Sequence, residues 1–89
     1  METYNKNNIS YLNDNMSGIY VLYSETKKII YIGESEDIKK RLNQHINNNE
    51  WEDAIYFDYL IINSKEDRMN SEKNYIQKYN PKHNELFTH

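Results

Sequence analysis

Residues 18–24, GIYVLYS, and residues 28–32, KIIYI, are the most informative part of this sequence. Both stretches are rich in residues that favour β-strands, and the residues between them are polar, so we expect an antiparallel hairpin. If a four-residue loop spans Ser24 to Lys27, Tyr20 lies directly opposite Tyr31. The Cβ atoms of the two tyrosines would then be about 5 Å apart on one face of the sheet.

A helix should follow the hairpin and run from Ser35 to about Asn48. The Ser35 hydroxyl can cap free backbone N–H groups, and the two acids after it favour the positive end of the helix dipole. An apolar stripe recurs at every fourth position, at Ile38, Leu42 and Ile46. Arg41 and His45 lie one turn apart on one flank of this stripe, so they should project together beside the core.

A third strand is expected over residues 54–62, followed by a second helix from Ser64 to about Tyr79. Ser64 opens a variant of the capping box, in which Asp67 replaces the usual Glu or Gln. The buried stripe of this helix is predicted to consist of Met69, Ile76 and Tyr79.

Glu72 falls inside that predicted buried stripe. A carboxylate on a core face carries a large desolvation cost unless it is paired, hydrogen-bonded or bound to a metal. The helix pattern alone leaves two interpretations open. Glu72 is either one half of a salt bridge with a neighbouring Lys or Arg, or a functional carboxylate.

The chain suits one compact domain, because two domains of an 89-residue chain would each have too little interior. Residues 1–15 contain five Asn and only scattered apolar residues, so we interpret them as an amino-terminal arm that docks on a domain over residues 16–89. There is no Cys, which excludes a disulfide framework and a thiolate zinc site. No apolar run approaches the roughly 20 residues of a membrane span, so we expect a cytoplasmic protein without membrane contact.

The formal net charge of −3 opposes binding to a polyanion. Basic residues nevertheless gather at Lys39, Lys40 and Arg41, with no acid between Ile38 and Asn49. This run predicts a local face for nucleic acid, although a solvated helix face is the more ordinary interpretation of such a run.

The tripeptides Gly18-Ile19-Tyr20 and Tyr31-Ile32-Gly33, separated by ten residues, resemble the signature of the GIY-YIG nucleases. The other functional positions of that family are also filled, by Arg41, His45, Glu72 and Asn84. The resemblance covers about residues 17–85. Members of the family act in DNA repair, in mobile elements and in phage, so a bacterial, phage or viral origin is expected.

The resemblance implies an α+β fold in which a three-stranded antiparallel sheet is flanked by helices. It also implies hydrolysis of a nucleic-acid strand, here expected to be DNA, with one Mg²⁺ or Mn²⁺ ion. The catalytic residues that it implies are Tyr20, Tyr31, Arg41, His45, Glu72 and Asn84.

Each of these residues has a chemical role in the family picture. Glu72 supplies the oxygen ligand that Mg²⁺ prefers, and Arg41 grips the phosphate through two donors. Asn84 orients a metal-bound water. His45 and Tyr31 exchange protons with the nucleophile and the phosphate.

Tyr20 is the expected general base. A phenol with a pKa of about 10 is ionised only at roughly one part in a thousand at pH 7. Arg41 or a relay through a metal-bound water must therefore assist it.

Other interpretations remain open at this stage. Tyr20 and Tyr31 could form an ordinary cross-strand pair, and His45 could be a simple flank residue. Trp51 could stack on a base, but packing of the first helix against the third strand is the stronger interpretation. Two further histidines, His83 and His89, lie at no convincing ligand spacing, so no zinc site is assigned.

The function also has alternatives. The chain could be a nucleic-acid or protein interaction module with the same fold, whose activity is lost or needs a partner. RNA is an alternative substrate. The net negative charge favours a protein partner or a homodimer that supplies specificity.

Overall fold

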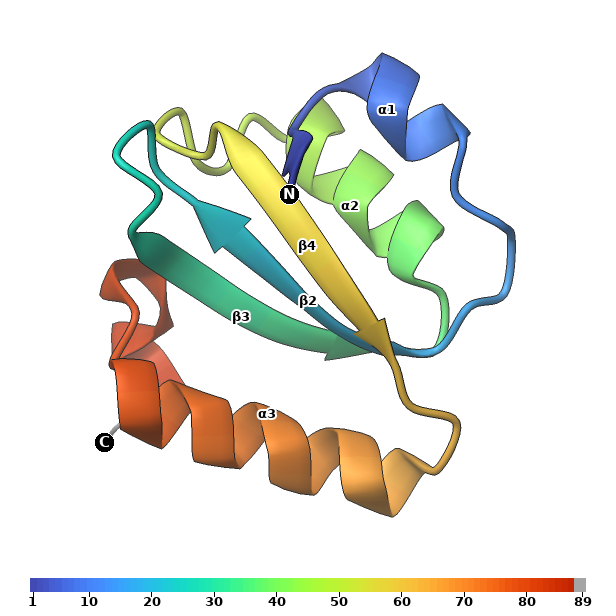
Figure 1. Cartoon of the computed structure of the whole chain (residues 1–89), viewed down its shortest axis with the longest axis vertical. Helices are drawn as coiled ribbons and strands as arrows, with labels where there is room; N and C mark the ends of the chain where they lie inside the picture. Colours follow the sequence, from blue (N-terminus) through green and yellow to red (C-terminus); the bar gives the residue numbers. More distant parts are fainter. Residues whose placement is uncertain (88–89) are drawn as a thin grey trace.

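The computed structural model describes residues 1–87 and has the predicted α+β architecture, an antiparallel sheet flanked by helices (Figure 1). One sheet contains four strands in the order β1-β4-β2-β3. The strands are β1 (Glu2–Thr3), β2 (Gly18–Tyr23), β3 (Ile29–Ser35) and β4 (Tyr56–Ile61). The helices are α1 (Lys6–Ser10), α2 (Ile38–Asn47), α3 (Lys65–Tyr79) and the 3₁₀ helix η1 (Lys82–Phe87).

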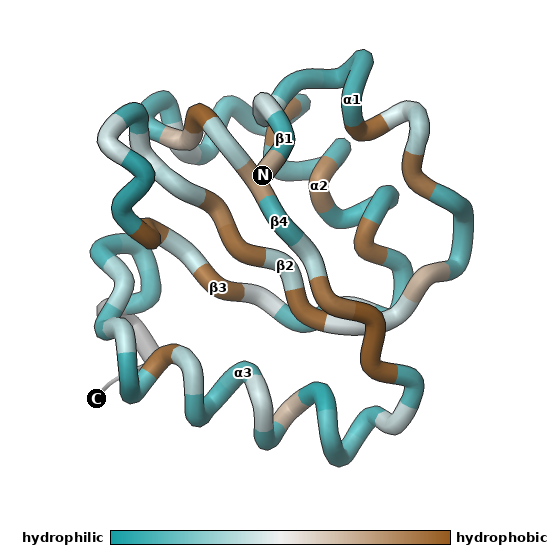
Figure 2. The backbone as a smooth tube through the Cα atoms, in the orientation of Figure 1, coloured by the Kyte–Doolittle hydropathy of each residue, from teal (hydrophilic) through white to brown (hydrophobic). Residues whose placement is uncertain are grey.

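The two faces of the sheet are covered by different helices. Successive residues of a strand point to opposite faces, so β2 contributes to both. Tyr20 of β2 joins the main core with Phe57 of β4 and the buried side of α2. Ile19 and Val21 point the other way and border a cavity shared with Tyr75 of α3. Figure 2 shows that apolar residues gather in the strands, whereas α3 is mostly hydrophilic.

The predicted three-stranded sheet is wrong by one strand, because the amino-terminal residues add β1. Glu2 pairs with Phe57 and Thr3 with Tyr56 at the edge of the sheet. Ile9 of α1 is fully buried in the main core and anchors the same segment. A strand of two residues is too short to show an alternating pattern, so the sequence did not reveal it.

The predicted register of the hairpin is also wrong. Tyr20 pairs with Gly33, and Tyr31 pairs with Leu22. The loop between β2 and β3 is one residue longer than predicted, and a bulge at the end of β2 adds a second residue on β3. The two tyrosines are therefore diagonal neighbours on one face, with ring centroids 6.0 Å apart.

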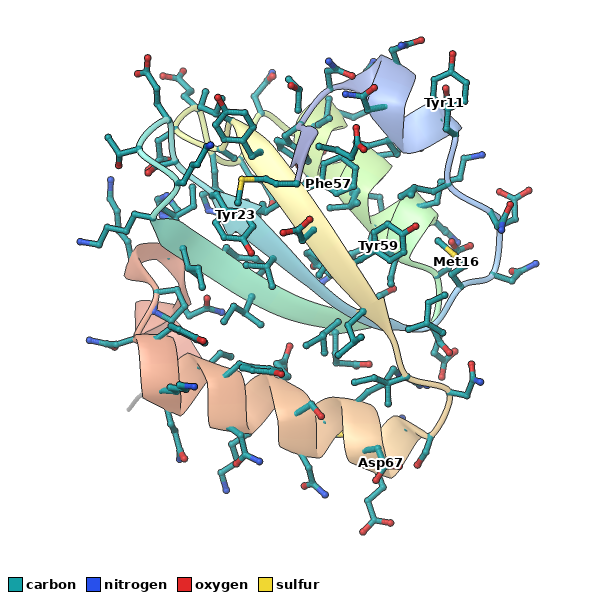
Figure 3. The ribbon with its side chains drawn as sticks, in the orientation of Figure 1. Tyr11, Met16, Tyr23, Phe57, Tyr59 and Asp67 are labelled. Atoms are coloured by element: carbon teal, nitrogen blue, oxygen red, sulfur yellow. The ribbon has the colours of Figure 1, made fainter. Side chains whose placement is uncertain are left out.

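The helix starts show one correction and one confirmation. Asp37, not Ser35, is the N-cap of α2, and its carboxylate accepts a hydrogen bond from the backbone N–H of Lys40. Ser35 ends β3 and instead accepts a hydrogen bond from the N–H of Asp37. Ser64 caps α3 as predicted, and its hydroxyl accepts a hydrogen bond from the N–H of Asp67, which is labelled at the start of α3 in Figure 3.

The buried stripe of α3 differs from the prediction. Ile76 is buried as expected, but Met69 and Tyr79 are 51% and 45% exposed. Arg68 is buried instead, because its guanidinium is bonded to Glu34 and to two backbone carbonyls just after β4. Within residues 1–87 no helix is long and apolar enough to cross a membrane.

Candidate active site

A hydrogen-bonded chain of three side chains lies between β2 and α2. Nε2 of His45 is 2.8 Å from the hydroxyl of Tyr20. The other ring nitrogen, Nδ1, is hydrogen-bonded to the carboxylate of Glu50. An ionised carboxylate accepts but does not donate, so Nδ1 carries the proton and Nε2 of the neutral ring accepts from Tyr20.

Burial sets the protonation states in this chain. Tyr20 is 1% exposed and His45 is 6% exposed. Burial raises the pKa of the Tyr20 phenol far above its ordinary value; Tyr31 adds to this rise, and the charge of Arg41 opposes it only in part. Burial also lowers the pKa of His45. The carboxylate of Glu50 raises this pKa, but by less than burial lowers it. At neutral pH Tyr20 is therefore a protonated donor and His45 a neutral acceptor.

Tyr31 of β3 is the phenol that a substrate can reach. It borders a cavity of about 310 Å³, which is also lined by Arg41 and His45 but not by Tyr20. Burial raises the pKa of Tyr31 as well, although its side chain is only half-buried. Tyr20 is buried behind this cavity, and its expected role as an assisted general base stays a prediction.

Arg41 lies one helical turn before His45, exposed and beside the same cavity. Its Nη1 donates to the side chain of Gln44 at 3.5 Å, a long contact that an anion can replace. A guanidinium placed in this way can hold two oxygens of one phosphate group.

The basic run on α2 is only partly available to a ligand. Lys39 is half-buried, and its ammonium lies 3.5 Å from the carboxylate of Asp14. Lys40 and Arg41 are exposed. An ion pair at the surface is weak, so Asp14 limits Lys39 without removing it.

Glu72 of α3 reaches the outer edge of β3. Its carboxylate is half-buried and burial raises its pKa, an effect opposed by the nearby backbone of Glu34 and reinforced by the charge on that residue. The charge of Glu72 in turn contributes to the raised pKa of Tyr31. Within residues 1–87 no Lys or Arg forms an ion pair with Glu72, so the structure does not support the salt-bridge interpretation.

The donor set around Glu72 suits Mg²⁺ better than a softer ion. Among the side chains that the structure describes, those of residues 1–84, no group of three or more His, Cys, Asp or Glu could surround a metal. A single desolvated carboxylate, with water as the remaining ligands, is an ordinary Mg²⁺ site in proteins. Glu72 is the residue that would hold such an ion.

Asn84 of η1 has a different contact from the one we expected. Its side chain is fully buried. Oδ1 accepts from the N–H of Ile32 at 2.9 Å, and Nδ2 donates to the carbonyl of the same residue at 3.0 Å. The amide therefore extends the open edge of β3 beside Tyr31, and the expected role of orienting a metal-bound water stays a prediction.

The two glycines of the tripeptides make room for this arrangement. A Cβ atom at Gly33 would lie 2.4 Å from the hydroxyl of Tyr20, on the neighbouring strand. A Cβ atom at Gly18 would lie 2.0 Å from the carbonyl oxygen of Leu60. The phenol of Tyr20 therefore fills the space that a side chain at position 33 would occupy.

Trp51 packs inside the site. Its ring lies 4.2 Å from that of Tyr31 with an angle of 29°, and 4.6 Å from that of His45. It also stacks on His83, whose Nε2 is 2.9 Å from the carboxylate of Asp53. These contacts pack Trp51 between α2 and β3, and not against the third predicted strand, and its ring also lines the cavity of Tyr31 and Arg41. His89 lies outside the described residues.

Sequence reasoning missed Glu50 and Arg68. Glu50 lies past the end of α2, where helix periodicity no longer predicts which residues share a face. Arg68 was not predicted to be buried because an arginine on a helix is usually solvated. An acid a few residues beyond a helix that carries a candidate histidine would have been the signal for Glu50.

Comparison with known proteins agrees with the fold. The model of the family described as "GIY-YIG catalytic domain" matches residues 16–85. The solved amino-terminal GIY-YIG endonuclease domain of UvrC from Thermotoga maritima, bound to its catalytic magnesium, superposes with a TM-score of 0.72 at 23% identity, over 86% of this chain and 92% of that one.

Curated relatives are much longer proteins. UvrABC system protein C of Pasteurella multocida is 32% identical over 78 residues, which are 79% of this chain and 13% of that protein. The same protein of Finegoldia magna is 28% identical over 75 residues, 75% of this chain and 12% of that protein. The chain thus spans only 12–13% of the length of these two relatives.

Proposed function

Because the chain belongs to the GIY-YIG nuclease family, we propose that it is an endonuclease that hydrolyses phosphodiester bonds of DNA with one divalent ion. The observation that carries this proposal is the hydrogen bond between Tyr20 and His45 next to the cavity lined by Tyr31 and Arg41. His45 and Arg41 line the same cavity, which supports the roles proposed for them, a proton acceptor and a phosphate-binding cation.

The side chains supply what hydrolysis of a phosphodiester needs. Arg41 binds the non-bridging oxygens and offsets the negative charge that develops on them. Asn84 keeps β3 in place, so that Tyr31 faces the cavity. Glu72 holds the divalent ion, which, when bound, polarises the phosphate and stabilises the charge on the leaving oxygen.

The proton path runs from the cavity to His45. As the water oxygen attacks phosphorus, its proton passes to the oxygen of Tyr31, the Tyr31 proton to Tyr20, and the Tyr20 proton to Nε2 of His45. The new P–O bond forms while the bond to the leaving oxygen breaks, and solvent protonates that oxygen. The ring centroids of Tyr20 and Tyr31 are 6.0 Å apart, which supports their proximity along this path.

The net charge of −3 bears on substrate choice. A negative chain binds a polyanion weakly unless its basic residues are concentrated or supplemented. We therefore propose that a protein partner or a second copy of the chain supplies the specificity, as part of the same function.

The test is incubation of the purified chain with supercoiled plasmid, branched DNA and RNA, each in Mg²⁺, Mn²⁺ or EDTA. Nicked or linear DNA in Mg²⁺ or Mn²⁺, absent in EDTA and absent with Tyr20→Phe, is the expected result. Cleavage of RNA alone would change the substrate class. Binding without cleavage under every condition would identify an interaction module instead.

A further inference from the structure

We propose that Glu50 is a positioning residue of this site, which holds His45 in the tautomer that accepts a proton from Tyr20. This inference rests on the proposed function. Glu50 also lines the cavity of Tyr31 and Arg41, and its carboxylate is hydrogen-bonded to His45; the role proposed for it is exerted through the ring of His45. The three residues correspond in arrangement to a hydroxyl, an imidazole and a carboxylate that orients the imidazole.

The end of α2 explains why Glu50 reaches His45. Asn48 caps the helix, and Asn49 follows with a φ of 50°, in the left-handed region. The N–H of Asn49 donates to the carbonyl of Ile46, and the N–H of Glu50 donates to the carbonyl of His45 at 3.3 Å. This pair of bonds is the Schellman motif, which turns the chain back over the last helical turn.

The turn therefore joins Glu50 to His45 twice, once through the backbone and once through the side chains. The exposed fraction falls along the chain of hydrogen bonds, from 36% for the side chain of Glu50 to 6% for His45 and 1% for Tyr20. The carboxylate thus keeps contact with solvent while it bonds to a buried ring. An ionised carboxylate at Nδ1 leaves Nε2 without a proton.

The same carboxylate stabilises the charge that the reaction creates. When the Tyr20 proton reaches Nε2, His45 becomes an imidazolium in a buried place, which costs free energy unless an anion is in contact. The groups that face the ring are Tyr20 on β2, Tyr31 on β3, Arg41 on α2, and Trp51 beside Glu50. Of the charged ones, Arg41 disfavours the imidazolium and Glu50 favours it.

The experiment compares Glu50→Ala and Glu50→Gln with the wild type. Glu52→Ala is the matched control, since it removes an exposed acid from the same loop. The first readout is the tautomer of His45, measured by ¹⁵N NMR of the ring nitrogens and assigned with a His45→Asn variant. The second is the single-turnover rate of plasmid nicking in Mg²⁺ between pH 5 and pH 9. Thermal unfolding of each variant reports whether it is folded.

We expect the Nδ1–H tautomer in the wild type and in Glu52→Ala, and the Nε2–H tautomer in Glu50→Ala. Nicking by Glu50→Ala should fall about tenfold to a hundredfold, as is usual when a partner of a functional histidine is removed. Glu50→Gln keeps an acceptor for Nδ1–H without the charge, so it should retain the tautomer and lose less activity.

The pH profile separates positioning from simple packing. Nicking needs neutral His45, so it declines as pH falls through the pKa of that ring. Glu50 raises this pKa, and its removal should move the acid limb of the profile to lower pH. A folded Glu50→Ala variant with the wild-type tautomer, rate and pH profile would overturn the inference. A wild type that cleaves no substrate would instead overturn the proposed function, and with it this role.

Discussion

Glu72 is the residue whose environment gives the clearest link between burial and function. Its pKa is raised, so folding favours the protonated carboxyl. The contribution of this group to stability is therefore full below its unfolded pKa and is lost as pH rises through the folded pKa. At neutral pH the ionised form is tolerated at a cost, which metal binding can offset.

We predict that Glu72→Ala abolishes nicking that depends on a divalent ion, while the free energy of unfolding at pH 7 is unchanged or higher. Removal of a desolvated carboxylate relieves its cost, and the ligand for the ion is lost. Urea unfolding and plasmid nicking in Mg²⁺ measure the two effects. Full activity of the folded variant would remove Glu72 from the metal site.

Arg41 allows a test of geometry against charge. We predict that Arg41→Ala reduces the nicking rate by orders of magnitude and that Arg41→Lys restores only part of it. Lys keeps the positive charge but cannot bond two phosphoryl oxygens in one plane. The residue is exposed, so both variants should fold. Wild-type turnover by the Lys variant would show that a point charge is enough.

At the scale of the strands, sequence reasoning identified β2, β3, β4 and both long helices, because each has a clear pattern. It failed where pairing depends on a single residue. The longer loop and the bulge place Tyr31 opposite Leu22. The polar residues of the loop do not reveal its exact length or the bulge, so the sequence could not predict this register. Asn84 was predicted to be functional, but only the structure shows that its amide pairs with the backbone of Ile32.

In the observed register, position 33 has no room for a side chain. We predict that Gly33→Ala lowers the free energy of unfolding by about 1–3 kcal/mol, the usual cost of overpacking. The added Cβ would lie 2.4 Å from the Tyr20 hydroxyl, so the phenol must move away from His45. Nicking should therefore fall with stability, measured by urea unfolding beside the plasmid assay.

The control for this prediction is Ser35→Ala, which adds no atom at the end of the same strand. If Gly33→Ala folds with unchanged stability and nicks DNA at the wild-type rate, the strands adjust freely. The position of Tyr20 against Gly33 would then have no part in the site.

At the scale of the whole molecule, the site is assembled from elements that the sequence separates widely. β2, β3 and α2 supply Tyr20, Tyr31, Arg41 and His45. The last two elements, α3 and η1, supply Glu72 and Asn84 at the free edge of β3. The motif predicted the residues that we propose for the site, whereas the contact of Glu50 with His45 depends on a turn at Asn49 that the motif does not include.

The balance of charge over the whole molecule leads to a prediction about binding. The net charge is −3, and the basic run on α2 offers Lys40 and Arg41, with Lys39 partly engaged by Asp14. Few phosphates can therefore be neutralised at once. Counterion release gives a slope of log affinity against log salt of about 0.9 per neutralised phosphate, so three or four contacts predict a magnitude of about 3 or 4.

The measurement is a salt titration of binding to a DNA duplex in Ca²⁺, which should permit binding while it slows chemistry that depends on Mg²⁺. Lys40→Ala should reduce the magnitude of the slope by about 0.9, whereas Lys65→Ala, at the start of α3, should leave it unchanged. A dimer or a partner protein would raise the slope, so the oligomeric state is measured in the same buffers. A magnitude of about 8 or more for a demonstrated monomer requires roughly twice the contacts that α2 can supply, and would place the main DNA-binding surface elsewhere on the molecule.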